Sequence, residues 1–145
     1  MNIDQINDEW EQDSSIDRNK LTEESLKTPN LHAKYLKILM AHKVKLMSKI
    51  HAFNELKLAK FRYYRGEMSK EDLTEHGWLQ WQGPRPLKGD MEQFLDGDKD
   101  MTKEKVRIQY LENCIYQLES ILVQIKARDW QIRNALENQK FIAGQ

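Results

Sequence analysis

Two long stretches of the chain place apolar residues at the three- and four-residue spacing of a helix face. The first begins at Thr28 and Pro29, since a threonine hydroxyl can cap a helix and proline is tolerated at the first helical position. Its apolar stripe consists of Leu36, Leu39, Leu46, Ile50 and Phe53. The pattern predicts a long helix over residues 29–66 that ends at Gly66, because no Gly or Pro interrupts it earlier.

The second stretch runs from about Met101 to Phe141 and repeats its apolar positions alternately three and four residues apart. Only Asp129 breaks this spacing, and we expect it to set the register of the seam together with Arg128 and Arg133. The pattern predicts a helix over residues 101–142 with a coiled-coil-like seam that joins subunits. The predicted oligomerisation residues are Ile108, Leu111, Ile115, Leu118, Leu122, Ile125, Ile132 and Leu136.

The other two segments have no long apolar stripe. Residues 1–28 hold eight acidic side chains against three basic ones, and the spacing of Ile3, Ile6 and Trp10 predicts a short helix in this acidic arm. The arm either folds over the basic helix, repels nucleic acid from one face, or remains solvated. Residues 67–100 hold four of the six glycines and two of the three prolines, so we expect an irregular connection there.

Composition limits the class of protein. Only 39% of residues are apolar and 32% are charged, which favours long helices that bury their stripes against other subunits. We therefore expect one all-α domain in which the long helices form a helical hairpin. No run of 18 apolar residues is present, Cys114 is the single cysteine, and the chain begins with acidic and polar residues. These features predict a soluble intracellular protein without a membrane span or a disulfide.

Positive charge concentrates in the first long helix, although the whole chain has 23 basic and 23 acidic residues. Between residues 29 and 66, nine basic side chains accompany the single acid Glu55, a net charge of +8 by direct count. Such a segment attracts polyanions. The nine residues are Lys34, Lys37, Lys43, Lys45, Lys49, Lys57, Lys60, Arg62 and Arg65.

The end of this helix, residues 57–65, alternates four cations with three aromatic rings. Cations bind phosphates and rings stack on unpaired bases, so the predicted DNA-binding residues are Lys57, Lys60, Arg62, Arg65, Tyr63 and Tyr64. Structural explanations stay open: the cations also complement the helix dipole, and the rings can belong to the core. Trp78 and Trp81 either fill a gap between helices or subunits, or stack on bases or a partner.

The sequence contains no recognisable catalytic or metal-binding pattern. No phosphate-binding loop or nucleophile elbow occurs, and the four histidines lack metal-ligand spacing. Asp96, Asp98 and Asp100 resemble a calcium loop, but Met101 and Arg107 stand where glycine and an acid are needed, so we expect these acids to cap the following helix. We expect a protein without enzymatic activity, metal or cofactor.

The stretch from Leu56 to Gly66 resembles the DNA-binding segment of the UvsY family, recombination mediators of T4-like bacteriophages. Family members carry Leu-Lys-Ala-Arg-x-x-Tyr-Tyr-x-Gly there. If the tyrosine pair is aligned, the motif's Arg corresponds to Lys60 and its Lys to Leu58, with the basic residue displaced to Lys57. Further similar pieces are Ile16-Asp17 to Lys20-Leu21, Leu87-Lys88 to Asp98-Lys99-Asp100, and Phe141-Ile142-Ala143-Gly144.

This resemblance implies an all-helical subunit in a closed ring of six or seven copies. Such a ring binds single-stranded DNA, destabilises the complex of that DNA with the phage single-stranded-DNA-binding protein, and promotes loading of a RecA-like recombinase. The expected location is the cytoplasm of the infected bacterial host. The alternative is a coiled-coil scaffold whose basic helix pairs with acidic arms of neighbouring subunits, or a general nucleic-acid-binding oligomer.

Overall fold

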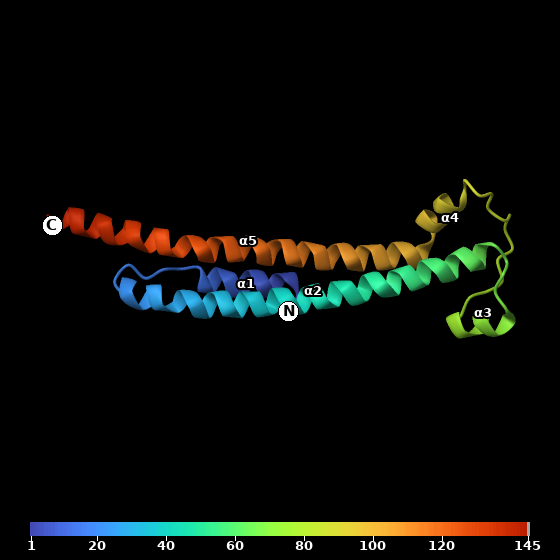
Figure 1. The fold of residues 1–145 in the computed structure, drawn as a ribbon, viewed down its shortest axis with the longest axis horizontal. Coiled ribbons are helices and arrows are strands. Elements are labelled where there is room, and N and C mark those ends of the chain that lie inside the picture. Colours follow the sequence, from blue (N-terminus) through green and yellow to red (C-terminus); the bar gives the residue numbers. More distant parts are fainter. Residues whose placement is uncertain (145) are drawn as a thin grey trace. The chain divides into compact units, whose positions relative to one another are not determined.

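The computed structural model describes residues 1–144, which form five α-helices and no strand. Their bounds are α1 (Ile3–Asp13), α2 (Leu21–Tyr64), α3 (Lys70–His76), α4 (Met91–Gly97) and α5 (Lys99–Ile142) (Figure 1). The predicted all-α class with long helices in a hairpin is confirmed. The chain divides into two compact units, of which the first joins Met1–Lys45 to the chain from Leu111 onward and the second is Leu46–Tyr110. None of the helices in residues 1–144 offers an apolar stretch long enough to cross a membrane.

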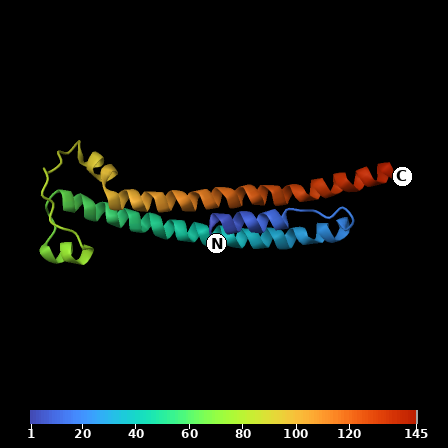
Figure 2. The ribbon, with the colours of Figure 1, turned by 180° about the vertical axis from the view of Figure 1, so that it is seen from behind.

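In the first unit, the acidic helix α1 packs along α2 (Figures 1 and 2). Trp10 contacts the edge of Tyr35 at 5.5 Å between ring centroids, and Ile6 is fully buried. Lys34 donates hydrogen bonds of 2.6 Å to both Glu9 and Asp13, which raise the pKa of this lysine. The acidic arm therefore folds over the basic helix at Lys34, one of the three arrangements expected for it.

The apolar seam of α5 is largely buried within the subunit itself. Five of its eight predicted residues are buried in the first unit: Leu111, Ile115, Leu118, Ile125 and Ile132. Leu122 is half-buried, as is Ile108 in the second unit, whereas Leu136 keeps 42% of its surface exposed. The seam thus joins α5 to helices of its own subunit. Its role in oligomerisation stays a prediction.

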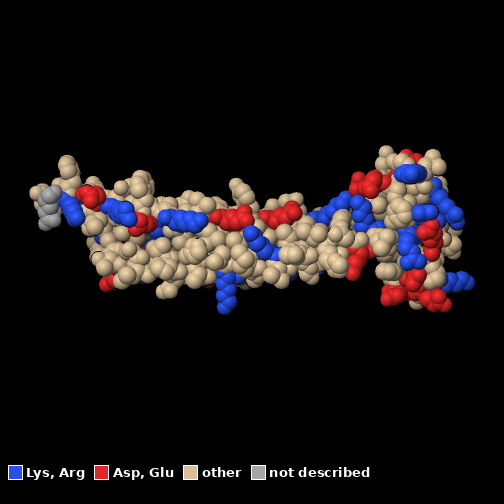
Figure 3. Space-filling model, in the orientation of Figure 1, with Lys and Arg blue, Asp and Glu red and all other residues tan. Residues whose placement is uncertain are grey.

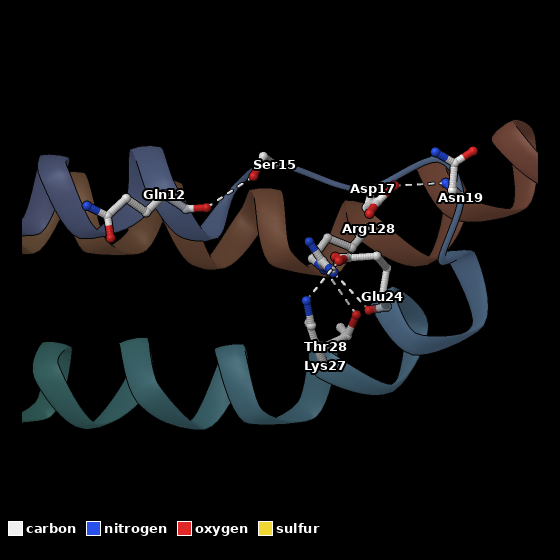
Figure 4. A network of polar contacts seen from close by, with 8 residues as sticks. All are labelled: Gln12, Ser15, Asp17, Asn19, Glu24, Lys27, Thr28 and Arg128. Carbon is white, nitrogen blue, oxygen red and sulfur yellow. Dashed lines mark hydrogen bonds and ion pairs between the residues drawn. The ribbon is translucent and has the colours of Figure 1, made fainter.

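The buried polar residue of α5 is Arg128 and not Asp129. Arg128 is 2% exposed, and its guanidinium donates to the Glu24 carbonyl at 2.8 Å, the Glu24 carboxylate at 3.2 Å and the Thr28 hydroxyl at 3.1 Å (Figure 4). Asp129 points outward and pairs with Arg133 at 2.9 Å. The expectation that Asp129 sets the register is therefore wrong, because Asp129 is exposed and its neighbour makes the contacts between the helices.

The start of α2 also differs from the prediction. The helix begins at Leu21 and includes Pro29, which was predicted to mark its beginning. Proline cannot donate to the Ser25 carbonyl one turn earlier and normally weakens a helix at this point. Here Arg128 binds Glu24 and Thr28, which precede Pro29, so tertiary hydrogen bonds hold the turn that proline weakens.

Hydrogen-bonded caps end and start the helices of the second unit. Gly66 has φ of +73°, its N–H bonds to the Tyr63 carbonyl and the N–H of Glu67 bonds to Arg62, as in a Schellman motif. Ser69 caps α3 by accepting from the N–H of Asp72. Asp98 caps α5 by accepting from the N–H of Met101, as expected for this acid. The connection of residues 67–100 thus contains two short helices, α3 and α4; the first follows the Ser69 cap and ends at Gly77, as the sequence from Ser69 to Gly77 predicts.

Candidate nucleic-acid interface

Five of the six predicted DNA-binding residues lie on the last turns of α2 and the sixth, Arg65, follows its end, but the six differ in accessibility. Lys57, Arg62 and Arg65 have side chains that are 44%, 48% and 51% exposed. Tyr63 is half-buried, whereas Lys60 and Tyr64 are buried. The segment therefore has an outer set of cations and an inner set of packed side chains. Direct DNA contact by these residues stays a prediction.

Lys60 is enclosed by opposite charge and aromatic rings. Its ammonium lies 3.1 Å from Asp98 Oδ2 and 2.9 Å from Asp100 Oδ2, while only 6% of the side chain is exposed. The same nitrogen lies 4.0 Å from the ring centroid of Trp78 and 5.2 Å from that of Tyr63. Two carboxylates and two ring faces thus replace the water that a surface lysine would keep.

Tyr64 and Asp98 complete this buried network. The Tyr64 hydroxyl donates a 2.6 Å hydrogen bond to Asp98 Oδ2, and burial followed by this bond raises the pKa of Tyr64. Burial alone would raise the pKa of Asp98, but bonds from Tyr64, the Met101 N–H and Lys60 outweigh it and lower that pKa. Asp98 is therefore a carboxylate at neutral pH, and its charge compensates that of Lys60.

An aromatic cluster holds the connection against the end of α2. Tyr64 contacts Trp81 at 5.0 Å and Phe94 at 5.7 Å, and Tyr63 contacts Trp78 at 5.4 Å between ring centroids. The Tyr63 hydroxyl donates to the Leu79 carbonyl at 2.6 Å. Both tryptophans thus fill space beside α2, the first of their two expected roles. They pack against the rings of Tyr63 and Tyr64.

The exposed cations have acidic neighbours of their own. Lys57 lies 3.7 Å from Glu92, Arg62 lies 3.8 Å from Asp72, and Arg65 lies 3.0 Å from Glu67. Figure 3 shows basic and acidic side chains next to one another in the unit that holds α3 and α4. Exposed pairs of this kind are weak, so phosphates can compete with these carboxylates.

Ion pairs with acidic side chains lower the effective positive charge of the basic segment well below the net charge of +8 counted from the sequence of residues 29–66. Six of the nine basic residues between residues 29 and 66 make an ion pair in the described residues, and only Lys37, Lys45 and Lys49 do not. Sequence reasoning missed most of these partners because they come from α1, α3, α4, α5 and the Asp98 cap; only Glu67, the partner of Arg65, is a neighbour in sequence. Two further cations, Arg85 and Lys88, stand in the proline-containing part of the connection.

No cluster of three or more His, Cys, Asp or Glu in residues 1–144 could hold a metal ion. The candidate interface contains cations, aromatic rings and helix caps. Such an arrangement can bind phosphates and planar groups by contact alone.

Comparisons with known proteins identify relatives of this fold. A family model described as "Recombination, repair and ssDNA binding protein UvsY" matches residues 9–145. Crystal structures of the bacteriophage T4 recombination mediator protein UvsY in lattice types II, IV and I match with TM-scores of 0.85, 0.81 and 0.79, each at 23% identity. The matches cover 99%, 97% and 94% of this chain and 98% of each T4 chain. A comparison with curated proteins found no match.

Proposed function

Because the chain belongs to the UvsY family of recombination, repair and single-stranded-DNA-binding proteins, we propose that it is a recombination mediator. In this role it binds single-stranded DNA, destabilises the complex between that DNA and the phage single-stranded-DNA-binding protein, and promotes loading of a RecA-like recombinase. It acts as a homo-oligomer without enzymatic activity, in the cytoplasm of the infected bacterial host.

The observation that carries this proposal is the separation of two sets of residues at the end of α2. Lys57, Arg62 and Arg65 keep about half of their side-chain surface exposed and bind phosphates. Lys60 and Tyr64 are buried, so in this proposal they position the helix end and do not touch DNA. Tyr63, half-buried, braces the connection through its bond to Leu79 and offers the remaining ring surface for stacking.

Assembly into an oligomer combines several weak DNA-binding sites into one tight-binding surface. A single cluster of three partly neutralised cations binds one short stretch of strand weakly. Several copies in one oligomer, a ring of six or seven in this proposal, bind the same strand with high avidity while each contact dissociates readily. A mediator needs both properties, since it must hold the strand and then release it to the recombinase.

The surface we propose for assembly is the exposed apolar stripe of α5, Tyr116, Val123 and Trp130. These residues are 75%, 63% and 67% exposed and recur every seven positions, so they lie on one face of the helix with a drift of about 20° per heptad. A second copy of the chain is the occupant we propose. Leu122 and Leu136, two of the predicted oligomerisation residues, are also only partly covered, but they lie in the buried seam on a different face of α5.

Fluorescence anisotropy of a labelled poly-dT strand tests the function. Binding should exceed that to duplex DNA and weaken steeply between about 50 mM and about 200 mM salt. The combined substitutions Arg62→Ala and Arg65→Ala should weaken binding and preserve assembly. Absence of binding at low salt would contradict the mediator and leave the scaffold. In such a scaffold the acidic arm of a neighbouring subunit would have to displace Glu9 and Asp13 from Lys34, because these two acids already pair with Lys34 of their own chain.

A further inference from the structure

An open groove of about 380 Å³ lies beside the predicted DNA-binding residues in the second unit. It is formed by the end of α2, by residues 86–88 of the connection and by the first residue of α4. Its lining residues are Phe61, Arg65, Pro86, Leu87, Lys88 and Met91. Of these, only Arg65 was predicted from the sequence to bind DNA.

The groove has an apolar lining that is accessible to solvent. Four of its six residues are apolar; Met91 is buried, whereas Leu87 is 74% exposed and Phe61 is 36% exposed. Exposed apolar side chains that converge on one groove, with a buried residue among them, favour a ligand with an apolar surface. The volume lies within the range of about 300–1,000 Å³ of small-molecule sites.

The charged residues of the groove are both basic. No acidic side chain lines it, and Lys88 makes no ion pair with any carboxylate of residues 1–144. Arg65 lies over the Phe61 ring at 5.3 Å and pairs with Glu67 outside the lining, in an exposed and therefore weak contact. A ligand with an apolar face and adjacent negative charges complements both features.

We propose that this groove binds one unpaired nucleobase of single-stranded DNA, against Phe61 and Leu87, while Lys88 and Arg65 bind the flanking phosphates. The inference rests on the proposed function and adds a subsite to it. A strand without secondary structure exposes base faces next to its phosphates, whereas duplex DNA keeps those faces in the stack. An apolar peptide would match the lining but not the two cations.

Anisotropy with two labelled strands tests the subsite: a dT oligonucleotide, and one of the same length with abasic tetrahydrofuran residues in its central part. The wild-type protein should bind the dT strand about fivefold or more tightly than the abasic strand. Phe61→Ala and Leu87→Ser should each reduce this preference, and Phe61→Trp, which keeps a ring, should retain it. Leu79→Ser is the matched control, since Leu79 is 87% exposed and lies outside the groove.

Lys88→Ala should weaken binding of both strands to the same extent and reduce the salt slope by about 0.7, the value for one phosphate contact on a single strand. Lys103→Ala, at an exposed lysine of the same unit without an ion pair in the described residues, is its control. Circular dichroism verifies that each variant keeps its helices.

The outcomes separate the subsite from the function. If the wild-type protein binds both strands equally, or if Phe61→Ala and Leu87→Ser keep the full preference for dT, the groove does not hold a base and the inference is overturned. In both cases the protein still binds DNA and the proposed function stands. If the wild-type protein binds neither strand, the proposed function and the subsite both fail.

Discussion

The hydroxyl of Tyr64 and the carboxylate of Asp98 are joined by a 2.6 Å hydrogen bond that spans 34 positions of the chain. The oxygen that accepts this bond, Oδ2, also lies 3.1 Å from the ammonium of Lys60, while Oδ1 accepts from the N–H of Met101 at the start of α5. One carboxylate therefore connects the end of α2 to the cap of α5. Its loss should disturb both helix ends.

Lys60 should matter for stability more than any exposed cation near it. Lys60→Ala leaves Asp98 buried without its cation, and we expect the free energy of unfolding to fall by about 3 kcal/mol. Arg62→Ala removes only an exposed contact of 3.8 Å to Asp72 and should change that free energy by less than about 0.5 kcal/mol. Urea unfolding followed by circular dichroism measures both. Equal effects of the two substitutions would contradict the structural role of Lys60.

Stability should fall in acid partly through Asp98. Its pKa is lowered in the folded protein relative to the ordinary value of 3.8, so the folded state binds fewer protons than the unfolded chain. The stabilisation is complete above the ordinary pKa and is lost as the pH falls through the lower folded value, over a window that begins near pH 3.8 and extends below it. We therefore expect the urea midpoint to decrease across this window.

Asp98→Asn isolates this contribution. The variant should be less stable than the wild type at neutral pH, and the difference should shrink as the pH falls through the window. Glu24 in the first unit also has a lowered pKa, through its hydrogen bond from Lys27 and then that from Arg128, but it is present in both proteins and cancels in the comparison. A difference that stays constant with pH would show that Asp98 does not titrate as its contacts predict.

Gly66 should resist substitution for two separable reasons. Its φ of +73° is unfavourable for any residue with a Cβ, and a Cβ there would lie 3.2 Å from Nη2 of Arg85. Gly77 has nearly the same φ, +72°, but no neighbouring atom within 4 Å of a Cβ. Gly77→Ala should therefore cost about 1 kcal/mol from backbone strain alone, and Gly66→Ala should cost more because Arg85 must also move. Thermal unfolding compares the two, and equal losses would mean that Arg85 yields freely.

The features that follow from local rules were predictable from the sequence. The predicted bounds of the last helix, 101–142, agree with Lys99–Ile142, and Gly66 ends α2 as expected, because periodicity and a left-handed glycine need no distant partner. The start of α2 was not predictable in this way. Its turns around Pro29 are held by Arg128, which follows Thr28 by 100 positions.

In the candidate site, too, the features that depend on distant contacts could not be predicted from the sequence. The positions of its cations and rings on one helix end followed from spacing, but the burial of Lys60 did not. That burial depends on Asp98 and Asp100 returning to the end of α2 after the connection, and on Trp78 covering the ammonium. A count of charges along one helix contains none of this information.

Assembly should depend on the exposed stripe of α5. Val123→Asp places a charge in the middle of that stripe, and we expect it to reduce the oligomer to smaller species, because a carboxylate inside an apolar contact is costly. Gln124→Asp introduces the same charge one position away, at an exposed residue outside the stripe. Light scattering coupled to size-exclusion chromatography measures the mass. Dissociation by both variants, or by neither, would exclude the stripe as the interface.

The ion pairs of the basic residues near the end of α2 affect how strongly DNA binding depends on salt. A phosphate that displaces Glu67 from Arg65 takes over a cation that already has a counterion supplied by the protein itself, so fewer small ions are released from the complex. Lys88, which has no such internal counterion among residues 1–144, should release the full share. The dependence of affinity on salt should therefore be shallower than the number of basic residues suggests, and it should drop more when Lys88 is removed than when Arg65 is.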